Sequence, residues 1–382
     1  MKDVYIASDN IISPLGFTTA ENMSNISKNL TGIKNIQDSA LSSEPFFASL
    51  INNQILAKTF ASIDDPTKYT KFEQLALLSI TDALSTTDID VTSKKTLFVL
   101  STTKGNIDLL EKNKKELFPQ KRIFIWNTAK LIQSFFNNPN QPVIVSNACI
   151  SGVIGLITAE RLLQTTEYEN IIITGVDIIS EFVVSGFLSF KSLSIGPCKP
   201  FDKSRDGLSL GEGCGTIILT TKKPTSDKNN IKIGAGAVSN DANHISGPSR
   251  TGEGLWLAIQ NTLKRNNNPS TIDYISAHGT ATPYNDEMEA KAISWAGLES
   301  TPVNSLKGFF GHTLGAAGII ESIVGTYSLR NNLLFETKGF NETGVSKNIN
   351  IITNTHQKEI NNCLKLASGF GGCNAAVLFI KQ

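Results

Sequence analysis

The stretch VIVSNACISGVIGLITAERLL, residues 143–163, decides the fold class. Its apolar run stops at Asn147, small residues follow, and a helical pattern of apolar residues begins near Gly152. A buried strand that enters a helix through a short turn is the repeating unit of α/β proteins. The stretch therefore predicts a buried strand at 143–148, a helix at 152–164, and a cysteine, Cys149, at the turn between them.

The rest of the chain repeats this alternation of short apolar strands and longer helical patterns. We expect further strands at 96–101, 170–176, 215–220, 231–239, 272–278 and 375–381, and helices at 71–85, 254–266 and 316–332. Residues 303–330 repeat the order of strand end, small-residue turn and helix, which suggests a two-fold internal duplication. The polar segment TKKPTSDKNN (221–230) predicts a boundary between units 1–222 and 223–382.

Composition excludes several classes of protein. The chain has 382 residues, 40% of them hydrophobic and 18% charged, with a net charge of +1, so no strong field points to nucleic acid or membranes. No run of about 18 apolar residues occurs, and the start resembles no signal peptide. The five cysteines are odd in number and lack CxxC spacing, which argues against disulfides and a zinc site. We expect a reduced, cytoplasmic protein without a membrane span.

Cys149 is the first candidate for chemistry. The dipole and the unpaired N–H groups of a helix N-terminus stabilise a thiolate, so this position predicts a lowered thiol pKa and donors for an oxyanion. The alternative is a small buried hydrophobic residue, as free cysteines often are. That alternative is the expectation for the other cysteines, Cys198, Cys214, Cys363 and Cys373.

Two of the four histidines stand at glycine-containing loops. His278 ends an apolar run and enters HGTATPYND, and His312 precedes a small-residue helix in KGFFGHTLGAAG. Both positions can face a cleft, but from the residues alone a functional and a structural role stay equally open. The string SGFGGCNAAVLFI (368–380) predicts a tight loop entering a strand, in which Phe370 is either a mobile gate or a core anchor. Because the spacing is not GxGxxG and the loop precedes a strand, a dinucleotide site is not expected.

Together these motifs resemble the β-ketoacyl synthases, the condensing enzymes of fatty-acid and polyketide synthesis. The matching segments follow one another in order along most of the chain: NIISPLG (10–16), SNACISG (146–152), PFDKSRDGLSLGEGCG (200–215), DANHISGP (241–248), HGTATPYNDEMEA (278–290), NSLKGFFGHTLGAAG (304–318) and GFGGCNAA (369–376). The resemblance implies a thiolase-like α/β fold, with duplicated halves in a five-layered αβαβα sandwich. The half 1–222 would carry the nucleophile and the half 223–382 the two histidines.

The resemblance also implies the chemistry. Cys149 would take an acyl group from acyl carrier protein, and malonyl carrier protein would then lose carbon dioxide and condense with that acyl group to a β-ketoacyl product. His278 and His312 would each donate an N–H to the enolate, and the backbone N–H groups of Cys149 and Phe370 would form the oxyanion hole. No metal or cofactor is implied, because the substrates are carried on the phosphopantetheine of the carrier protein.

Supporting residues follow from the same resemblance. Lys307 would support the histidine site electrostatically and pair with Glu289, although a buried ion pair that only holds loops together is equally open. Thr280 and Thr282 would bind the phosphopantetheine arm. Phe370 would be a gate that pivots on Gly369 and Gly371.

Departures from the family pattern leave some properties open. Ile150 stands where a small or hydroxylated residue is commoner, Cys373 stands where threonine is usual, and segment 112–142 is short and poorly matched. The expected partners are acyl carrier protein and a second synthase chain, in a homodimer or in a heterodimer with a chain-length-factor-like subunit. Two alternatives remain: the chain is itself such a structural subunit, which would lack the cysteine, or it is a thiolase-type acyltransferase, which would need a second catalytic cysteine. A fatty-acid and a specialised polyketide or polyene pathway both fit.

Overall fold

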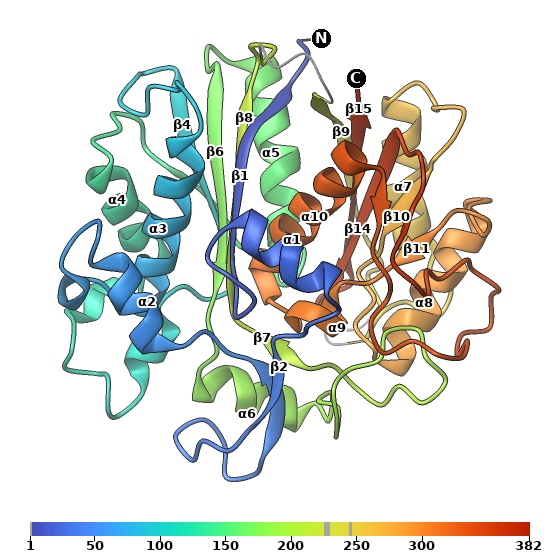
Figure 1. Ribbon diagram of the computed structural model, residues 1–382, viewed down its shortest axis with the longest axis horizontal. Coiled ribbons are helices and arrows are strands. Elements are labelled where there is room, and N and C mark those ends of the chain that lie inside the picture. Colours follow the sequence, from blue (N-terminus) through green and yellow to red (C-terminus); the bar gives the residue numbers. More distant parts are fainter. Residues whose placement is uncertain (1, 225–229, 244–246) are drawn as a thin grey trace.

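The computed structural model describes residues 2–224, 230–243 and 247–382. Most of the predicted linker, residues 225–229, and His244 in the motif DANHISGP lie outside the described residues. The main sheet of the described chain has a continuous order of ten strands, which divides into two five-stranded mixed sheets joined at one edge, with helices between and outside them (Figure 1).

The first sheet has the strand order β5-β4-β6-β8-β1. Its strands are β1 (Tyr5–Ile12), β4 (Thr96–Ser101), β5 (Val143–Val145), β6 (Asn170–Asp177) and β8 (Gly213–Thr220). Strand β4 is parallel to β5 and β6, whereas β8 is antiparallel to β6 and β1. The strands β4, β6 and β8 are buried along their full length, which explains why they are continuous apolar runs rather than alternating ones.

The second sheet repeats this arrangement with the order β11-β10-β14-β15-β9. Its strands are β9 (Ile231–Asn240), β10 (Tyr274–Ser276), β11 (Val303–Asn304), β14 (Asn362–Gly369) and β15 (Cys373–Lys381). Strand β10 is parallel to β11 and β14, and β15 is antiparallel to β14 and β9, as in the first sheet. The two sheets therefore have the same topology, and a single pair, Tyr5 with Lys232, joins their edges.

Helices complete five layers. The central layer is α5 (Ser151–Thr165) and α10 (Ala317–Asn331), which contact each other and both sheets. Helices α3 (Lys71–Ser85) and α4 (Ile125–Phe135) cover the outer face of the first sheet, and α7 (Glu253–Arg265) and α8 (Pro283–Trp295) that of the second (Figure 1). The remaining elements are α1 (Thr19–Ser27), α2 (Asn53–Phe60), α6 (Glu181–Ser189), α9 (Lys307–Phe310), β2 (Ile33–Ile36), β3 (Phe46–Ser49), β7 (Leu210–Gly211), β12 (Leu333–Leu334) and β13 (His356–Gln357).

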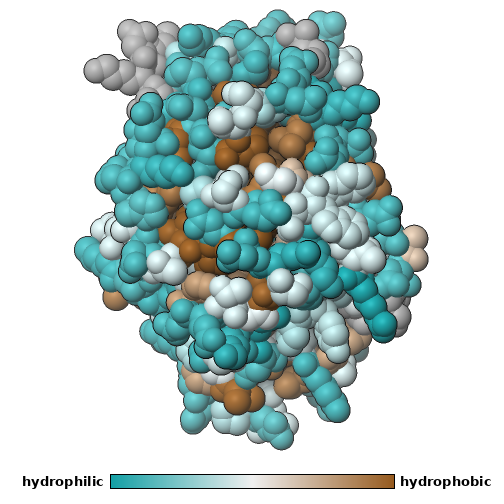
Figure 2. Space-filling model, turned by 90° about the vertical axis from the view of Figure 1, so that its right-hand side faces the viewer, coloured by the Kyte–Doolittle hydropathy of each residue, from teal (hydrophilic) through white to brown (hydrophobic). Residues whose placement is uncertain are grey.

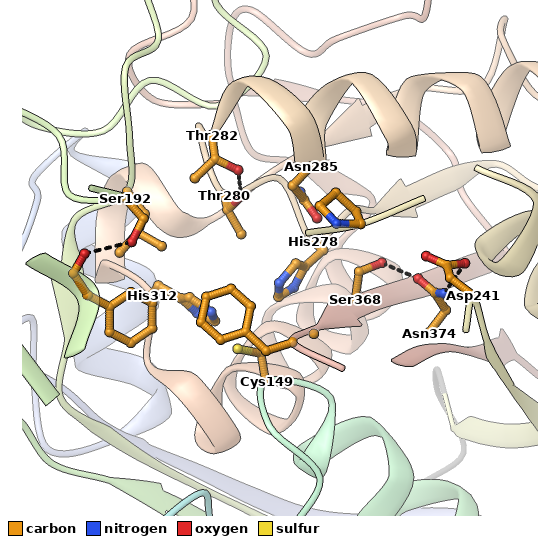
Figure 3. Close-up of a pocket in the computed structure, with 15 residues that line it drawn as sticks. Cys149, Ser192, Asp241, His278, Thr280, Thr282, Asn285, His312, Ser368 and Asn374 are labelled. Atoms are coloured by element: carbon orange, nitrogen blue, oxygen red, sulfur yellow. Dashed lines mark hydrogen bonds between the residues drawn. The ribbon is translucent and has the colours of Figure 1, made fainter. Parts of the chain in front are cut away.

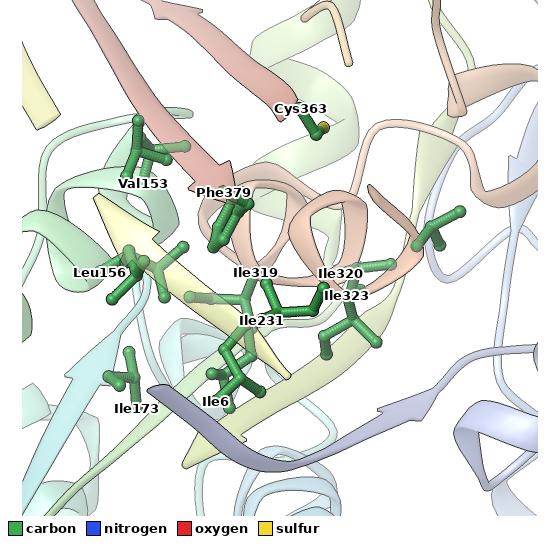
Figure 4. Packing of buried hydrophobic residues seen from close by; sticks show 14 of the residues in the cluster. Ile6, Val153, Leu156, Ile173, Ile231, Ile319, Ile320, Ile323, Cys363 and Phe379 are labelled. Carbon is green, nitrogen blue, oxygen red and sulfur yellow. The ribbon is translucent and has the colours of Figure 1, made fainter. Parts of the chain in front are cut away.

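The two central helices meet at glycines. A Cβ placed on Gly152 would lie 2.8 Å from the backbone nitrogen of Ile319, and one on Gly318 would lie 2.5 Å from that of Val153. Only glycine permits this close backbone approach. Apolar side chains from both sheets, among them Ile173 of β6 and Phe379 of β15, surround the crossing (Figure 4). Because the helices cross near their N-terminal ends, the residues that precede α5 and α10 are brought together.

The outer layer of the second half faces solvent. Figure 2 views the side on which α7 and α8 lie, and hydrophilic side chains predominate there with hydrophobic groups between them. Trp256 of α7 and Trp295 of α8 meet edge to face on these helices, with ring centroids 6.5 Å apart. Within the part of the chain that the structure describes, no helix combines the length and the apolar character needed to cross a membrane.

The predicted α/β class is confirmed, but the strand predicted at 143–148 is shorter than expected. The apolar run predicts a buried strand at 143–148, whereas β5 covers Val143–Val145 only and is partly buried. The physical reason is its position at the edge of the sheet, where it pairs with β4 alone. The residues after it form the turn that carries Cys149.

Candidate active site

Cys149 lies in a strained turn between β5 and α5. Ala148 before it has a φ of +44°, in the left-handed region that non-glycine residues rarely adopt. Ser151 closes the turn, because its hydroxyl accepts the N–H of Asn147 at 2.8 Å and donates to the carbonyl of Ala148 at 2.6 Å. Ile150 is the N-cap of the helix, so the thiol stands directly before the first turn.

The two predicted histidines come from the other half of the chain and meet at this turn. His278 follows β10, and His312 lies between α9 and α10. Their rings are 5.2 Å apart between centroids and nearly perpendicular, at 83°. Cys149, His278 and His312 line one cavity, with the sulfur facing the two imidazoles (Figure 3).

The loop between β14 and β15 forms the next wall of the cavity. A Cβ on Gly369 would lie 3.2 Å from the backbone nitrogen of Cys149, so the loop lies directly against the nucleophile turn. Gly371 has a φ of +86°, which favours glycine. The ring of Phe370 stacks on Phe187 at 5.7 Å and meets Phe190 edge-on at 5.3 Å, both centroid distances.

Polar groups line the opposite side (Figure 3). The hydroxyls of Thr280 and Thr282 are 2.9 Å apart. Ser192 and Asn285 line the same space. A second set joins the end of β14, the start of β15 and the residue after β9: Ser368 donates to Asn374 at 2.8 Å, and Asn374 donates to Asp241 at 3.0 Å. The resemblance implied the two threonines but not these other polar lining residues.

The predicted lowering of the Cys149 pKa is wrong. Burial raises the pKa of this thiol to about 11, against the opposing influence of the ammonium groups of Lys104 and Lys307. Cys149 is only 7% exposed, so desolvation of the thiolate outweighs the helix terminus. The resting group is therefore a thiol, and its attack on a thioester requires transfer of its proton to a base.

This protonation state predicts the pH dependence of alkylation. Because the thiolate fraction rises about tenfold per pH unit below the pKa, we expect iodoacetamide to modify Cys149 about 100-fold faster at pH 9 than at pH 7, without a plateau. Mass spectrometry of the peptide that contains Cys149 measures the rate. Modification of the half-exposed Cys373 in the same digest controls for reagent decay. A plateau reached below pH 8 would contradict a buried, protonated thiol.

Both imidazoles are neutral, and a neutral imidazole accepts a proton only at the ring nitrogen that carries no hydrogen. Burial, followed by the charge of Lys307, holds the pKa of His278 and of His312 well below the ordinary value. The ammonium of Lys307 lies 3.4 Å from Nδ1 of His278 and donates to the carbonyl of His278 at 2.5 Å. An ammonium can only donate, so Nδ1 is an acceptor, and the N–H of the neutral ring is at Nε2. Nδ1 of His312 is buried and has no hydrogen-bond partner among the described residues.

The predicted ion pair between Lys307 and Glu289 is also wrong. Lys307 instead donates to Oε1 of Glu321 on α10 at 2.6 Å, and both side chains are buried. A second buried lysine, Lys365 of β14, lies 2.5 Å from the other oxygen of the same carboxylate. Glu321 and Lys365 were not among the predicted site residues. Glu321 is the fifth residue of α10 and lies nine residues after His312 in the sequence, and this spacing alone does not indicate which lysine it meets.

Glu289 has a different task. Its carboxylate accepts the backbone N–H groups of His278 at 2.6 Å and of Gly279 at 2.7 Å. Burial raises its pKa to about 7, although these two N–H groups oppose the shift. Glu289 therefore holds the backbone that carries the His278 ring, from the side opposite the cavity wall.

The structure thus brings Cys149, His278, His312, Thr280, Thr282 and Phe370 onto one cavity wall, with Gly369 among them, Gly371 in the adjoining loop, and Lys307 and Glu289 behind His278. Cys373 is not part of the described cavity wall, and its sulfur lies 3.3 Å from Nδ2 of Asn240. Within residues 2–224, 230–243 and 247–382, no three His, Cys, Asp or Glu side chains come together as a metal site.

Comparison with known proteins gives a consistent result. The N-terminal domain model of the beta-ketoacyl synthases matches residues 1–225, and the C-terminal domain model matches residues 232–341. The 3-oxoacyl-[acyl-carrier-protein] synthase 2 of Vibrio harveyi is 26% identical, over 99% of this chain and 98% of its own.

Solved structures share the fold. The ishigamide ketosynthase/chain length factor superposes with a TM-score of 0.86 at 20% identity, over 100% of this chain and 99% of its own. A ketosynthase in complex with its chain length factor from Xenorhabdus doucetiae superposes with a TM-score of 0.88 at 21% identity, over 100% and 98%. The expected thiolase-like sandwich is confirmed.

Proposed function

Since the chain belongs to the β-ketoacyl synthase family, we propose that it forms a carbon–carbon bond by decarboxylative condensation, with Cys149 as the acyl carrier and His278 and His312 as the decarboxylating pair. The observation that supports this assignment most directly is the meeting of one buried thiol and two neutral imidazoles on one cavity wall. The nucleophile comes from the proposed half 1–222 and the histidines from the proposed half 223–382.

The first step transfers the acyl group. The sulfur of Cys149 attacks the thioester carbonyl of an acyl carrier protein while the thiol proton moves to the neutral imidazole of His312, since Nδ1 of His278 already accepts from Lys307. The carbonyl oxygen becomes an oxyanion, and the backbone N–H groups of Cys149 and Phe370 stabilise it from the adjoining turn and loop. When the carbonyl re-forms, the bond to the phosphopantetheine sulfur breaks, and that sulfur takes the proton from the imidazolium.

The second step makes the new bond. Malonyl carrier protein loses carbon dioxide, and the electron pair of the broken carbon–carbon bond moves into an enolate. The N–H groups of His278 and His312 stabilise the enolate oxygen, which requires both rings to be neutral donors. The enolate carbon then attacks the acyl thioester on Cys149. The carbon–sulfur bond breaks, and the cysteine leaves as a thiolate that takes a proton from solvent.

The surrounding residues control access. Thr280 and Thr282, on the polar side of the cavity, hydrogen-bond the phosphopantetheine arm. Phe370, packed between two other aromatic rings, is a gate that moves with its glycine neighbours, Gly369 and Gly371. Opening this gate breaks the contacts of Phe370 with Phe187 and Phe190 and gives the substrate access to the thiol.

The partners follow from the chemistry and from one edge of the fold. The substrates arrive on acyl carrier protein, in the cytoplasm. The edge strand β5 and the exposed aromatic pair of Phe124 and Trp126, whose ring centroids are 6.3 Å apart, are the proposed contact surface for a second synthase chain. The resemblance to a ketosynthase solved with its chain length factor favours a heterodimer. Because Cys149 and both histidines are present, the chain is the catalytic member of such a pair and not the structural one.

The test uses the wild-type protein, purified alone and with candidate partner chains. Intact-protein mass spectrometry measures acyl transfer to Cys149 from acyl carrier proteins of different chain length, and trapping measures carbon dioxide released from malonyl carrier protein. Both activities are expected. A thiolase-type reaction would instead transfer acyl groups without releasing carbon dioxide. Release of carbon dioxide without any acylation of Cys149 would contradict the proposed order of steps.

A further inference from the structure

Lys365 is a completely buried cation that the mechanism above does not use. It lies in the middle of β14, with no exposed side-chain surface, on the same face of the strand as Cys363 and Ala367. An ammonium without water around it is costly unless each of its donors has an acceptor. Its contacts therefore show what it holds in place.

Two of these contacts are to the backbone just before His278. The ammonium donates to the carbonyl of Ser276 at 3.3 Å and to that of Ala277 at 3.1 Å. The ladder between β10 and β14 ends at this level, because Ser276 opposite Lys365 is its last pair. Lys365 thus donates hydrogen bonds to the carbonyls at and just after the end of β10. At this point the chain leaves the sheet and places the imidazole of His278 in the cavity.

The third contact joins Lys365 to Lys307 through one carboxylate. Glu321 has one oxygen 2.6 Å from Lys307 and the other 2.5 Å from Lys365. Lys307 then has three acceptors for its three N–H groups: Glu321 and both the carbonyl and Nδ1 of His278. Lys365 hydrogen-bonds the two carbonyls and forms an ion pair with Glu321, without a hydrogen bond to Oε2 of that carboxylate among the described residues.

We propose that Lys365 is a positioning residue for the decarboxylation step, which fixes the strand end behind His278 and holds Glu321 in the orientation that directs Lys307 onto Nδ1 of that histidine. This proposal rests on the proposed function. It adds a second lysine to the support of the histidine pair, and it assigns that lysine to carbon dioxide release rather than to acyl transfer, because its contacts reach His278 and not the Cys149 turn.

The charge of Lys365 acts on the same rings. Burial and then Lys307 lower the pKa of both His278 and His312 most; next come His312 for His278 and Lys104 for His312, and Lys365 follows in both cases. The titratable groups around His278 and Lys365 come from six elements and the loops beside them: Cys149 before α5, Tyr274 on β10, Glu289 on α8, Lys307 on α9, His312 and Glu321 before and on α10, and Cys363 on β14. Loss of this cation is therefore expected to raise the pKa of both imidazoles and to move the acid limb of carbon dioxide release to higher pH.

The test compares two half-reactions in Lys365→Met, which keeps the length of the side chain and removes its charge. We expect carbon dioxide release from malonyl carrier protein to slow by at least about tenfold, since small displacements of a catalytic group cost this much or more. Acylation of Cys149 is expected to stay within about threefold of wild type. Cys363→Ala, two residues away on the same face of β14, is the control, and it should change neither rate by more than about threefold.

A second variant keeps the proposal testable if Lys365→Met does not fold. Lys365→Gln retains an N–H donor for the strand-end carbonyls, so it should recover part of the rate while the acid limb stays displaced. Carbon dioxide release within threefold of wild type would overturn the proposal, as would an equal fall of both half-reactions or an acid limb that does not move. If wild type itself releases no carbon dioxide, the proposed function fails first, before Lys365 is tested.

Discussion

Replacing Cys149 by alanine is expected to abolish condensation, with product formation at least about 10⁴-fold below wild type. The alanine has no nucleophile, and the fold around position 149 provides no substitute on the described cavity wall: the hydroxyl of Ser151 is committed to closing the turn, and Cys373 lies outside the wall. Because the removed sulfur is small and the turn is held by Ser151, the variant should remain folded.

The measurement is intact-protein mass spectrometry after incubation with acyl carrier proteins, together with product analysis. No acyl adduct is expected on Cys149→Ala under conditions that fully acylate wild type. Cys214→Ala is the matched control, because Cys214 is equally buried but lies in β8 among apolar residues of the outer core. It should be acylated normally. A stable acyl adduct on Cys149→Ala would show that another residue is the nucleophile.

The second large effect is expected from either histidine. His278→Ala or His312→Ala should slow carbon dioxide release from malonyl carrier protein by about 10²- to 10³-fold, the usual cost of one missing donor to a developing oxyanion. In His278→Ala, acyl transfer should fall by less than about tenfold, because His312 remains to take the thiol proton. The same variant is therefore expected to slow carbon dioxide release much more than acyl transfer.

His356→Ala is the control for the histidine variants. His356 lies on the exposed strand β13, where its ring contacts the carbonyl of Asn354, and it does not line the described cavity. It should leave both rates unchanged. If His278→Ala and His312→Ala kept carbon dioxide release within tenfold of wild type, the enolate would have other donors and the assignment of the pair would be wrong.

Local sequence patterns predicted many of the helices and strands, because buried apolar residues recur in these elements at regular spacing. The helix at 71–85 and the strand at 96–101 have the predicted bounds, since α3 starts at a Thr70–Glu73 capping box and β4 is buried throughout. The strand β14 was not predicted. Lys365 interrupts the apolar run of β14, so the sequence pattern did not indicate a buried strand there.

The electrostatics of the site could not be predicted from the sequence, because they depend on what surrounds each group in three dimensions. A helix N-terminus predicts an acidic thiol, but residues of the other half cover Cys149 and reverse the shift. Likewise, Lys307 had several carboxylates within reach along the chain, and only the folded arrangement of α9 and α10 brings Glu321 to it. The sequence motifs indicated which residue types form the site, whereas the ion pairs between these residues could be determined only from the fold.

The order of strands in the second sheet has a consequence for how the protein is made. Strands β14 and β15 follow the others in sequence, yet they lie between β10 and β9 in the middle of the sheet. During translation, the first sheet can close while the second still has a central gap. A nascent chain therefore exposes the Cys149 turn long before Lys365 and the loop with Phe370 emerge from the ribosome. Truncated chains that lack this last hairpin should engage chaperones rather than acyl carriers.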